Sequence, residues 1–561
     1  MPPRRFSPSP AKLCLFASVL LFIVLFWRLG SATFWDPDEA HYAQTSREMI
    51  ERGDWLAPYY NGSPFFDKPA LFHVLQASAM LALGPTELAA RIVPALAALA
   101  LVGLTAWAGA SLVSLETGLV AALLLAMNPG LFGLSRYAIL DTLFTAFTFG
   151  GAALLSVAAV RGRRALEWGG YALLALAVLV KGPLALVLCG LTLLVACVWS
   201  ADARRRLLSL HWAMGLGLVI GLAAPWFLYM LARFGDAFVQ GYVLDENLRL
   251  YGSSRFANQP GPLFYTQILL VGMLPWTGLL LGRLVDDLRA SWRGGAPLDT
   301  VEVLLWSWVG AILVFFSGST FKLDHYVFPT APALCLLCAR AWLEACADPA
   351  SPRHAGARVG LRLIGPLLLL VGIGASIFVV ARLELPRAAI AVPIAVASCG
   401  ALLTAGRDGR GGASPAALWL TTVAMLAVYG GVVGFAMPAL EARKVVPDVA
   451  RWVAARAETE RIAAYGLNRW APAFRFYVSR PTTFLDDPLE AAAFVRAREP
   501  FYCVMTREGL AELETAGLAL RVVYEREGLW ATSGRALWRR QLPPAHFVVV
   551  TRGDSVVAAA D

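Results

Sequence analysis

Long apolar runs, separated by short basic stretches, dominate the hydrophobic pattern of this chain. Because roughly 20 apolar residues cross a bilayer as a helix, each run is a candidate transmembrane helix. The first run is long for a signal peptide and lacks a clear cleavage site, so we expect it to stay attached. The pattern predicts a polytopic α-helical membrane protein with thirteen spans, at residues 13–30, 89–109, 117–135, 140–160, 166–181, 183–200, 211–231, 263–283, 301–317, 327–345, 360–382, 388–405 and 416–438.

Composition agrees with a membrane protein, since 58% of the residues are hydrophobic and 16% are charged. The net charge of +9 is concentrated in five loops, after spans 4, 6, 8, 10 and 12, and in a basic segment before span 1. If every span crosses, all six lie on one side, which is the positive-inside pattern. We therefore expect a cytoplasmic N-terminus, an outer C-terminus and no nucleic-acid partner.

The polar regions between the spans divide the chain further. Residues 1–12 are expected to be a disordered cytoplasmic N-terminus, and residues 13–440 a transmembrane catalytic domain. Its first outer loop, 31–88, carries helix signals: one amphipathic helix ending at Gly53, an Asn61-Gly62 turn, and a second helix from Pro69 to about Gly84. Residues 441–561 alternate β-rich and helical runs, which predicts a small soluble α/β domain on the outer side.

Three carboxylates and a histidine follow the first span directly, in the sequence Phe34-Trp-Asp-Pro-Asp-Glu-Ala-His-Tyr42. Asp36 is expected to cap a helix, with Pro37 in its first turn. Asp38 would then lie at the second helical position and share a face with His41 and Tyr42. A carboxylate at a helix start stays ionised and suits a general base. The alternative is that this stretch is only a good helix start.

Other outer-side polar residues could join Asp38. Asp141 opens span 4, as an N-cap, as a cleft residue or as both. Lys68 and Lys322 lie in aromatic surroundings and either reach lipid headgroups or hold an anionic phosphate, in which case Arg249 is a candidate to join them. Lys181 is expected to reach the headgroups. A divalent metal on His41, Asp67, His73 and His325 is conceivable, although their spacing matches no known ligand pattern.

Several motifs, in order, resemble the bacterial GT-C glycosyltransferases that use polyprenyl-phosphate sugars, in particular the lipid A aminoarabinose transferases. The chain is more distantly similar to protein O-mannosyltransferases. The resemblance covers roughly residues 30–335. It rests on Asp36-Pro-Asp-Glu-Ala-His-Tyr42, Gly53-Asp-Trp55, Phe66-Asp-Lys-Pro69, Leu140-Asp141, Lys181-Gly-Pro183, Glu246-Asn-Leu248, Leu274-Pro-Trp276 and Lys322-Leu-Asp-His-Tyr326.

The resemblance implies roles for individual residues. Asp38 matches the acid thought to be catalytic, and Asp141 a second important acid. Lys68 matches a lysine that holds the donor phosphate, while Lys322 and Tyr326 lie near the donor. Glu39, His41 and Tyr42 are expected to bind substrate with them. His41 departs from the arginine common in aminoarabinose transferases, so the phosphate clamp and the sugar are open.

The sequence thus predicts an inverting membrane glycosyltransferase that takes a sugar from a polyprenyl-phosphate donor. The acceptor is lipid A, another envelope glycan or a protein, on the outer face of the cytoplasmic membrane. No cofactor is certain. The alternative is a transporter or flippase of lipid-linked sugars, but that class places its charges near the bilayer midplane in repeated halves, which are not evident here.

Overall fold

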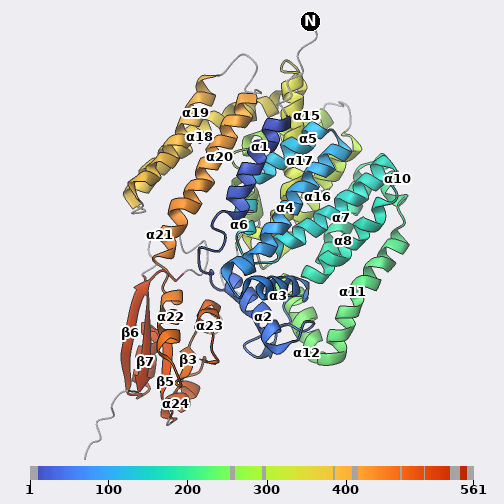
Figure 1. Cartoon of the computed structure of the whole chain (residues 1–561). Helices are drawn as coiled ribbons and strands as arrows, with labels where there is room; N and C mark the ends of the chain where they lie inside the picture. The colour runs from blue at the N-terminus through green and yellow to red at the C-terminus, as the bar shows by residue number, and fades with distance from the viewer. Residues whose placement is uncertain are drawn as a thin grey trace, which may run out of the picture.

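The protein consists of a large helical bundle with a small sheet domain at one end (Figure 1). The computed structural model describes residues 10–252, 260–292, 298–382, 386–406, 415–467, 471–497, 499–530 and 544–552. We call the end of the bundle that carries the sheet the domain end. The bundle helices are α1 (Pro10–Leu21), α4 (Glu87–Leu112), α5 (Leu115–Ala126), α6 (Pro129–Ser135), α7 (Asp141–Arg161), α8 (Leu166–Lys181), α9 (Leu184–Trp199), α10 (Ala201–Leu208), α11 (Trp212–Phe234), α12 (Asp236–Phe238), α13 (Leu250–Gly252), α14 (Phe264–Gly272), α15 (Thr277–Trp292), α16 (Thr300–Gly318), α17 (Ala331–Ala347), α18 (Ala355–Arg382), α19 (Ala391–Ala405), α20 (Pro415–Gly431) and α21 (Met437–Glu441).

The bundle has the length and apolarity of a multi-span membrane protein. All thirteen predicted spans contain helix, and within the described ranges eight helices are individually long and apolar enough to cross a bilayer. Two more spans are broken: α5 and α6 meet at 63°, and α14 and α15 at 116°. The remaining three are shorter helices. The structure therefore supports eight to ten spans by length and composition, and the number thirteen stays a prediction.

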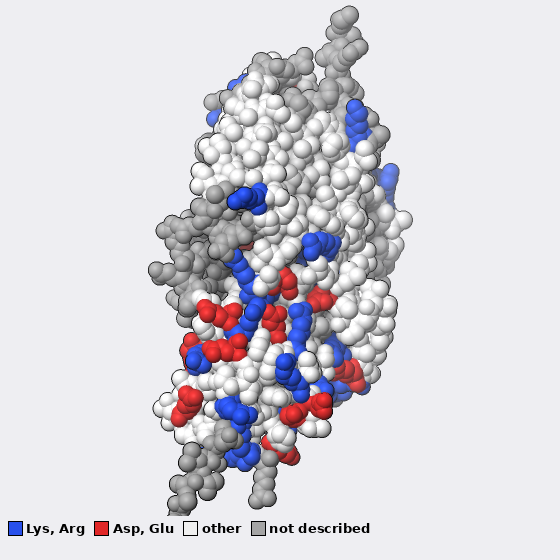
Figure 2. All heavy atoms as spheres, turned by 60° about the vertical axis from the view of Figure 1, so that its left-hand side comes forward, with Lys and Arg blue, Asp and Glu red and all other residues white. Residues whose placement is uncertain are grey.

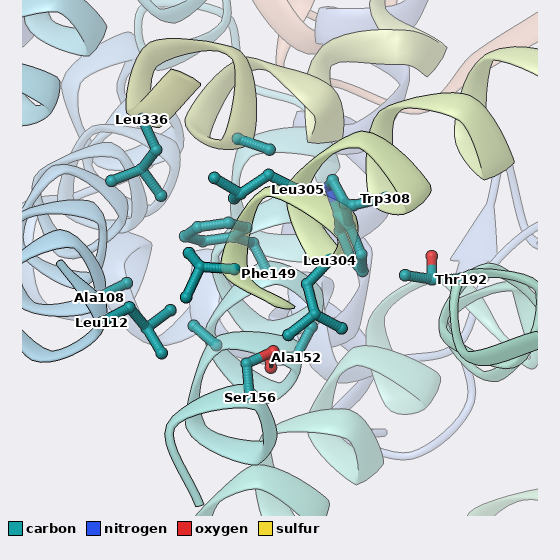
Figure 3. Close-up of a pocket in the computed structure, with 13 residues that line it drawn as sticks. Ala108, Leu112, Phe149, Ala152, Ser156, Thr192, Leu304, Leu305, Trp308 and Leu336 are labelled. Atoms are coloured by element: carbon teal, nitrogen blue, oxygen red, sulfur yellow. Dashed lines mark hydrogen bonds between the residues drawn. The ribbon is translucent and has the colours of Figure 1, made fainter. Parts of the chain in front are cut away.

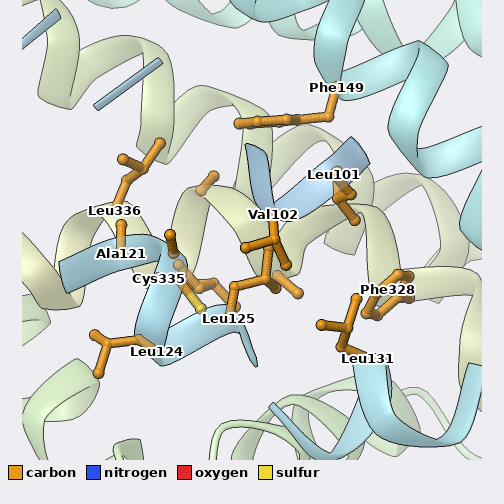
Figure 4. Close-up of a cluster of buried hydrophobic side chains, with 14 of the residues drawn as sticks. Leu101, Val102, Ala121, Leu124, Leu125, Leu131, Phe149, Phe328, Cys335 and Leu336 are labelled. Carbon is orange, nitrogen blue, oxygen red and sulfur yellow. The ribbon is translucent and has the colours of Figure 1, made fainter. Parts of the chain in front are cut away.

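Small residues allow the centre of the bundle to pack closely. α4, α5, α7 and α17 share a core that includes Leu101, Leu125, Phe149 and Leu336 (Figure 4). A Cβ on Gly118 would lie 2.2 Å from the carbonyl oxygen of Ala106, so α4 and α5 could not keep this distance with a larger residue there. Close backbone approach at small residues is how helices gain packing energy in a bilayer.

The segment between α1 and α4 forms a compact layer at the domain end. It holds α2 (Asp38–Arg52), the hairpin β1 (Tyr59–Tyr60) and β2 (Ser63–Pro64), and α3 (Leu71–Leu83). Gly53 ends α2 with φ +65°, and Asn61 and Gly62 both have positive φ in the hairpin, as predicted. α3 begins at Leu71, two residues after the predicted Pro69. Thr86 caps α4 by accepting a hydrogen bond from the N–H of Ala89.

The C-terminal region is an α/β domain, as the alternating pattern predicts. Its sheet has the strand order β4-β3-β5-β7-β6, with β3 parallel to β4 and β5, and β7 antiparallel to β5 and β6. Figure 2 shows one face of the molecule. The charged side chains on this face gather in the lower part of the view, whereas the bundle above them is mostly uncharged. The elements are α22 (Val446–Arg456), β3 (Arg461–Tyr465), α23 (Pro472–Val478), β4 (Thr482–Leu485), α24 (Pro488–Arg496), β5 (Phe501–Thr506), α25 (Arg507–Thr515), β6 (Leu520–Gly528) and β7 (Ala545–Arg552).

Candidate active site

Asp38 is the first residue of α2, one position earlier than predicted. The N-cap residue is Pro37, and no side chain caps the helix, so the prediction that Asp36 caps α2 is wrong. The Asp36 carboxylate turns away and accepts a hydrogen bond from the N–H of Ala473, at 2.8 Å. Asp38 is left half-buried at the positive end of the helix dipole.

Glu39 anchors the polypeptide on which Asp38 is held. Its buried carboxylate forms two bonds with Arg91 of α4, at 2.5 and 2.8 Å, and accepts the N–H of Ala138 at 3.0 Å. The Arg91 guanidinium also donates to the carbonyl oxygens of Leu29, Ala32 and Thr33. Because these contacts occupy both carboxylate oxygens, the structure places Glu39 in the scaffold of the site.

His41 and Tyr42, which the sequence predicts on one face with Asp38, have different surroundings. The His41 ring packs edge-on against Tyr60 and Phe65, with centroids 3.9 and 4.7 Å away. Burial lowers the pKa of His41 to about 4, so its imidazole is uncharged at neutral pH. Burial, with the charges of Asp141 and Asp38, raises the pKa of Tyr42 well above its ordinary value. Tyr42 therefore belongs with the carboxylates, and His41 with an aromatic cluster.

Asp141 is held by cations from two other elements. It is the first residue of α7, but the N-cap residue is Leu140 and no side chain caps the helix, so the N-cap prediction is wrong. Its carboxylate contacts Lys181 Nζ at 2.5 Å and His325 Nε2 at 3.6 Å. His325 comes from the 3₁₀ turn η3 (Asp324–Thr330).

Lys181 is buried at the end of α8, so the prediction that it reaches lipid headgroups is wrong. Its ammonium lies 4.6 Å from the ring centroid of Tyr326 and 5.4 Å from that of Phe144. The following residue, Gly182, has φ +81°, and a Cβ there would lie 2.1 Å from the Tyr242 hydroxyl. The Lys-Gly-Pro motif therefore ends α8 while directing the lysine inward.

The other three predicted basic residues differ in position. Lys68 Nζ lies 3.5 Å from a Glu246 carboxylate oxygen, and both side chains are largely buried. Lys322 is buried and donates to the carbonyl of Ser319 in its own loop. Arg249 pairs with Asp245 at 2.6 Å, and 61% of its side chain is exposed. Lys68 is thus the one of these three that the structure brings toward the two aspartates.

Electrostatic coupling joins these groups into one site. Burial raises the pKa of Asp38, positive charge on His325 and Lys68 opposes the rise, and the negative charge of Asp141 adds to it. We call this set the carboxylate–lysine site: Asp38, Tyr42, Lys68, Asp141, Lys181 and His325. Lys181 was not among the predicted site residues, and His325 was named only as a candidate metal ligand, although both lie in quoted motifs. Their role emerges only when α7, α8 and η3 meet.

Two other possible binding features give a different picture. Within the described ranges, no group of three or more His, Cys, Asp or Glu side chains is arranged to hold a metal ion. The divalent metal thus stays a prediction.

A pocket between α4, α7, α9, α16 and α17 is lined mainly by apolar side chains, with Ser156 and Thr192 as polar exceptions (Figure 3). It begins two turns along α7 from Asp141 and offers no ionisable group.

The carboxylate–lysine site combines an available base with fixed positive charge. In the described part of the chain, no cation lies within ion-pair distance of Asp38, whereas Asp141 is bound to Lys181. Asp38 can therefore accept a proton, while Lys68 and Lys181 can stabilise an anion that forms beside it. Such an arrangement suits displacement of an anionic leaving group by a hydroxyl.

Comparison with known proteins supports this chemistry. The sequence model of the family described as dolichyl-phosphate-mannose-protein mannosyltransferase matches residues 15–237. The chain is 29% identical over 375 residues to the undecaprenyl phosphate-alpha-4-amino-4-deoxy-L-arabinose arabinosyl transferase of Yersinia pestis (strain Pestoides F), covering 65% of this chain and 64% of the relative. A relative with the same name from Pectobacterium carotovorum is 29% identical over 60% of each protein.

Two solved structures show the same fold over almost the whole chain. ArnT from Cupriavidus metallidurans bound to undecaprenyl phosphate is 22% identical, with a TM-score of 0.71 and coverage of 98% of this chain and 99% of that one. Its apo state gives a TM-score of 0.73, with coverage of 97% and 98%. The predicted resemblance and the predicted fold class are therefore confirmed.

Proposed function

We propose that this chain, which has the fold of ArnT and the sequence motifs of polyprenyl-phosphate-sugar transferases, is an inverting glycosyltransferase of that kind. The donor is a sugar on undecaprenyl phosphate or a related polyprenyl phosphate. The acceptor is a hydroxyl group of lipid A, of another envelope glycan or of a protein. The observation that carries the proposal is the carboxylate–lysine site, in which Asp38 has no ion-pair partner among the described residues and shares the site with the largely buried Lys68 and Lys181.

The reaction that this geometry favours is a single displacement. Asp38 accepts the proton of the acceptor hydroxyl as its oxygen bonds to the anomeric carbon from the face opposite the phosphate. The bond between that carbon and the phosphate oxygen breaks, and the phosphate leaves with the electron pair. Asp38 then returns its proton to solvent. One displacement inverts the configuration of the anomeric carbon.

Positive charge near the leaving group lowers the barrier further. Negative charge grows on the phosphate as its bond to the sugar breaks, and the ammonium groups of Lys68 and Lys181 are largely sequestered from water. Charges fixed in a dry site stabilise a transition state without reorganising. Asp141 pairs with Lys181 at 2.5 Å, so its role is to position the cation.

The location of the site supports a reaction at a membrane surface. Asp38, Asp141 and Lys68 lie at the domain end, next to the layer formed by α2 and α3, and the arginine-rich α10 lies at the opposite end (Figure 1). Since arginine-rich loops favour the cytoplasm, we place the site and the C-terminal domain on the outer face of the cytoplasmic membrane.

A transfer assay with purified protein tests the proposal. The donors are a panel of polyprenyl-phosphate sugars, the acceptors are lipid A, envelope glycans and peptides, and both the released polyprenyl phosphate and the glycosylated product are measured. We expect stoichiometric release and transfer with at least one pair. No turnover of any donor would contradict the assignment, and movement of an intact donor across vesicles without bond cleavage would favour the flippase instead.

A further inference from the structure

The five residues before Asp38 are bound by the C-terminal domain. We call residues 33–37 the approach segment. It runs from the region of Arg91 to the start of α2, beside α23 and the chain that leads into α22 (Figure 1). Thr33, Phe34 and Asp36 are buried, so their polar groups need partners inside the protein.

α23 supplies two of these partners. The hydroxyl of Tyr477 accepts the N–H of Phe34 at 2.8 Å and donates to the Glu87 carboxylate, also at 2.8 Å. The N–H of Ala473 donates to Asp36 Oδ1 at 2.8 Å. One short helix therefore holds the approach segment at both ends and connects it to the first turn of α4.

The chain between α21 and α22 supplies further contacts. Lys444 Nζ donates to the carbonyl oxygen of Thr33 at 2.6 Å, and its charge lies 4.7 Å from the ring centroid of Trp35. Glu441 accepts the N–H of Thr33 at 3.0 Å and pairs with Lys444 at 3.2 Å. Thr33 is thus bound on both sides of its peptide by residues more than 400 positions away.

Apolar contacts reinforce the polar ones. Phe34 meets Phe476 edge-on, with centroids 4.9 Å apart, and Ala40 and Ala43 of α2 belong to the same buried cluster as Phe474 of α23. Farther along α2, Arg47 donates to the carbonyl oxygen of Phe476 at 3.1 Å. The C-terminal domain therefore shares a hydrophobic core with the helix that begins at Asp38.

We propose that the C-terminal domain positions the catalytic base, with Tyr477 and Asp36 as positioning residues that fix the approach segment and hence Asp38. This inference rests on the proposed function. A carboxylate at the first position of a helix follows the backbone before it, because no side chain caps α2. Small displacements of a reacting group cost large factors in rate, so loosening of this segment slows turnover while the protein stays folded.

The first test is Tyr477→Phe in the full-length protein, which removes one hydroxyl and keeps the ring. The matched control is Tyr524→Phe, in the same domain, where the ring stacks on Trp452. We expect Tyr477→Phe to lower kcat about tenfold or more with donor KM changed less than about threefold. Hydrogen exchange measured by mass spectrometry should quicken in residues 33–42. The control should change neither quantity.

The second test uses Asp36, whose pKa burial raises to about 8 despite the Ala473 hydrogen bond and the charge of Lys444. The other titratable groups around it are Glu39 and Tyr60. Below this pKa the carboxyl is neutral, and the contact with α23 is intact. As the pH rises through about 8, the carboxyl becomes charged. The Ala473 hydrogen bond favours that form, but the larger cost of a buried charge should loosen the approach segment, so kcat should fall.

Two substitutions separate positioning from folding. Asp36→Asn keeps a neutral acceptor for the Ala473 N–H, so we expect kcat near the wild-type value at pH 7 and no loss of kcat through pH 8 to 9. Asp36→Ala removes the acceptor and should lower kcat at every pH. An alkaline fall that persists unchanged in Asp36→Asn would overturn the role of Asp36.

The exchange measurement keeps this inference independent of the proposed function. If wild-type protein transfers no sugar, exchange in residues 33–42 still reports whether Tyr477 holds the segment. Wild-type exchange and wild-type kcat in Tyr477→Phe would overturn the inference while leaving the transferase assignment intact. Equal effects in Tyr477→Phe and Tyr524→Phe would also overturn it, because general loosening of the domain would then be the cause.

Discussion

The protein contains two clusters of buried charge, and they are built differently. At the opposite end from the C-terminal domain, Arg283 contacts Asp287 at 2.9 Å, Glu344 at 2.6 Å and Glu302 at a still shorter distance. Arg340 pairs with Asp299 at 2.6 Å and with Glu344 at 2.8 Å. We call this set the arginine network. In the carboxylate–lysine site the cations are lysines and a histidine, and two of its contacts are longer, at 3.5 and 3.6 Å.

The difference separates structural charge from reactive charge. In the arginine network each carboxylate faces a guanidinium, whose rigid fork matches carboxylate geometry and cannot lose its proton. Such a cluster joins α15, α16 and α17, and each of the carboxylates named here is already paired with an arginine. The carboxylate–lysine site leaves Asp38 outside the ion pairs. A buried ionisable group that its neighbours only partly compensate indicates function.

The largest expected effect is that of Asp38→Asn on turnover. The amide cannot accept the acceptor proton, so kcat should fall about a thousandfold or more, which is roughly 4 kcal/mol at the transition state. Because burial raises the pKa of Asp38, wild-type kcat should already fall at a higher pH on the acid side than for an ordinary carboxyl. The measurements are kcat for both proteins and the pH profile of the wild type.

The stability of Asp38→Asn provides the control. A raised carboxyl pKa means that the folded state favours the neutral form, so the neutral amide should not lower the melting temperature in detergent. If Asp38→Asn turned over at the wild-type rate, Asp38 would not be the base. If it melted early, Asp38 would belong with the structural charges.

Arg283→Met tests the other cluster and should act on stability. It takes the Arg283 guanidinium away from the buried Glu302, which keeps only a longer contact with Arg340 at 3.5 Å, and from the half-buried Glu344. We expect this to cost about 3 kcal/mol or more. Thermal unfolding in detergent should show a clear drop in melting temperature, with kcat per folded molecule little changed. The matched control is Arg205→Met, whose side chain is 79% exposed and pairs with Asp202 on the surface. A loss of kcat without a loss of stability in Arg283→Met would erase the distinction between the clusters.

Much of this architecture can be read from the sequence because its signals are local. Apolar length predicts the helices, and Gly53 predicts the end of α2. The β-rich runs predict β3, β5, β6 and β7 to within a few residues. The short strand β4 and the helices α23 and α24 carry weaker patterns and were not predicted.

The site was harder to predict because its geometry comes from distant contacts. Asp36 and Asp141 look like helix caps from their neighbours, but Ala473 and Lys181 bind them instead, 437 and 40 residues away. Lys181 looks like a headgroup lysine because the residues before it are apolar. Nothing near it in sequence shows that its partner opens the preceding helix. His41 lies in the motif but packs against Tyr60 of the hairpin and against Phe65, which directly follows it, and its neighbours in the sequence do not show this.

Lys68→Met should have an intermediate effect on donor turnover, because it removes one positive charge from the carboxylate–lysine site. Removing the ammonium takes one cation away from Glu246 and deprives the leaving phosphate of a positive charge, so kcat/KM for the donor should fall about ten- to a hundredfold. Lys68→Arg keeps the charge in a different shape and should recover part of the loss. Lys322→Met is the matched comparison, since that ammonium binds the carbonyl of Ser319. A larger loss of kcat/KM in Lys322→Met than in Lys68→Met would mean that the phosphate binds near Lys322.

The smallest effect is expected for Arg249→Ala, although the sequence places Arg249 among the substrate-binding residues. Its side chain is 61% exposed, and its pair with Asp245 is one turn away on the surface of the same helical segment. Exposed pairs of this kind contribute about 0.5 kcal/mol or less, and water screens their charge from a distant phosphate. We expect kcat/KM within about threefold of wild type and an unchanged melting temperature. A loss as large as that of Lys68→Met would show that the donor draws Arg249 inward when it binds, and would extend the reactive cluster beyond the residues that already contact one another.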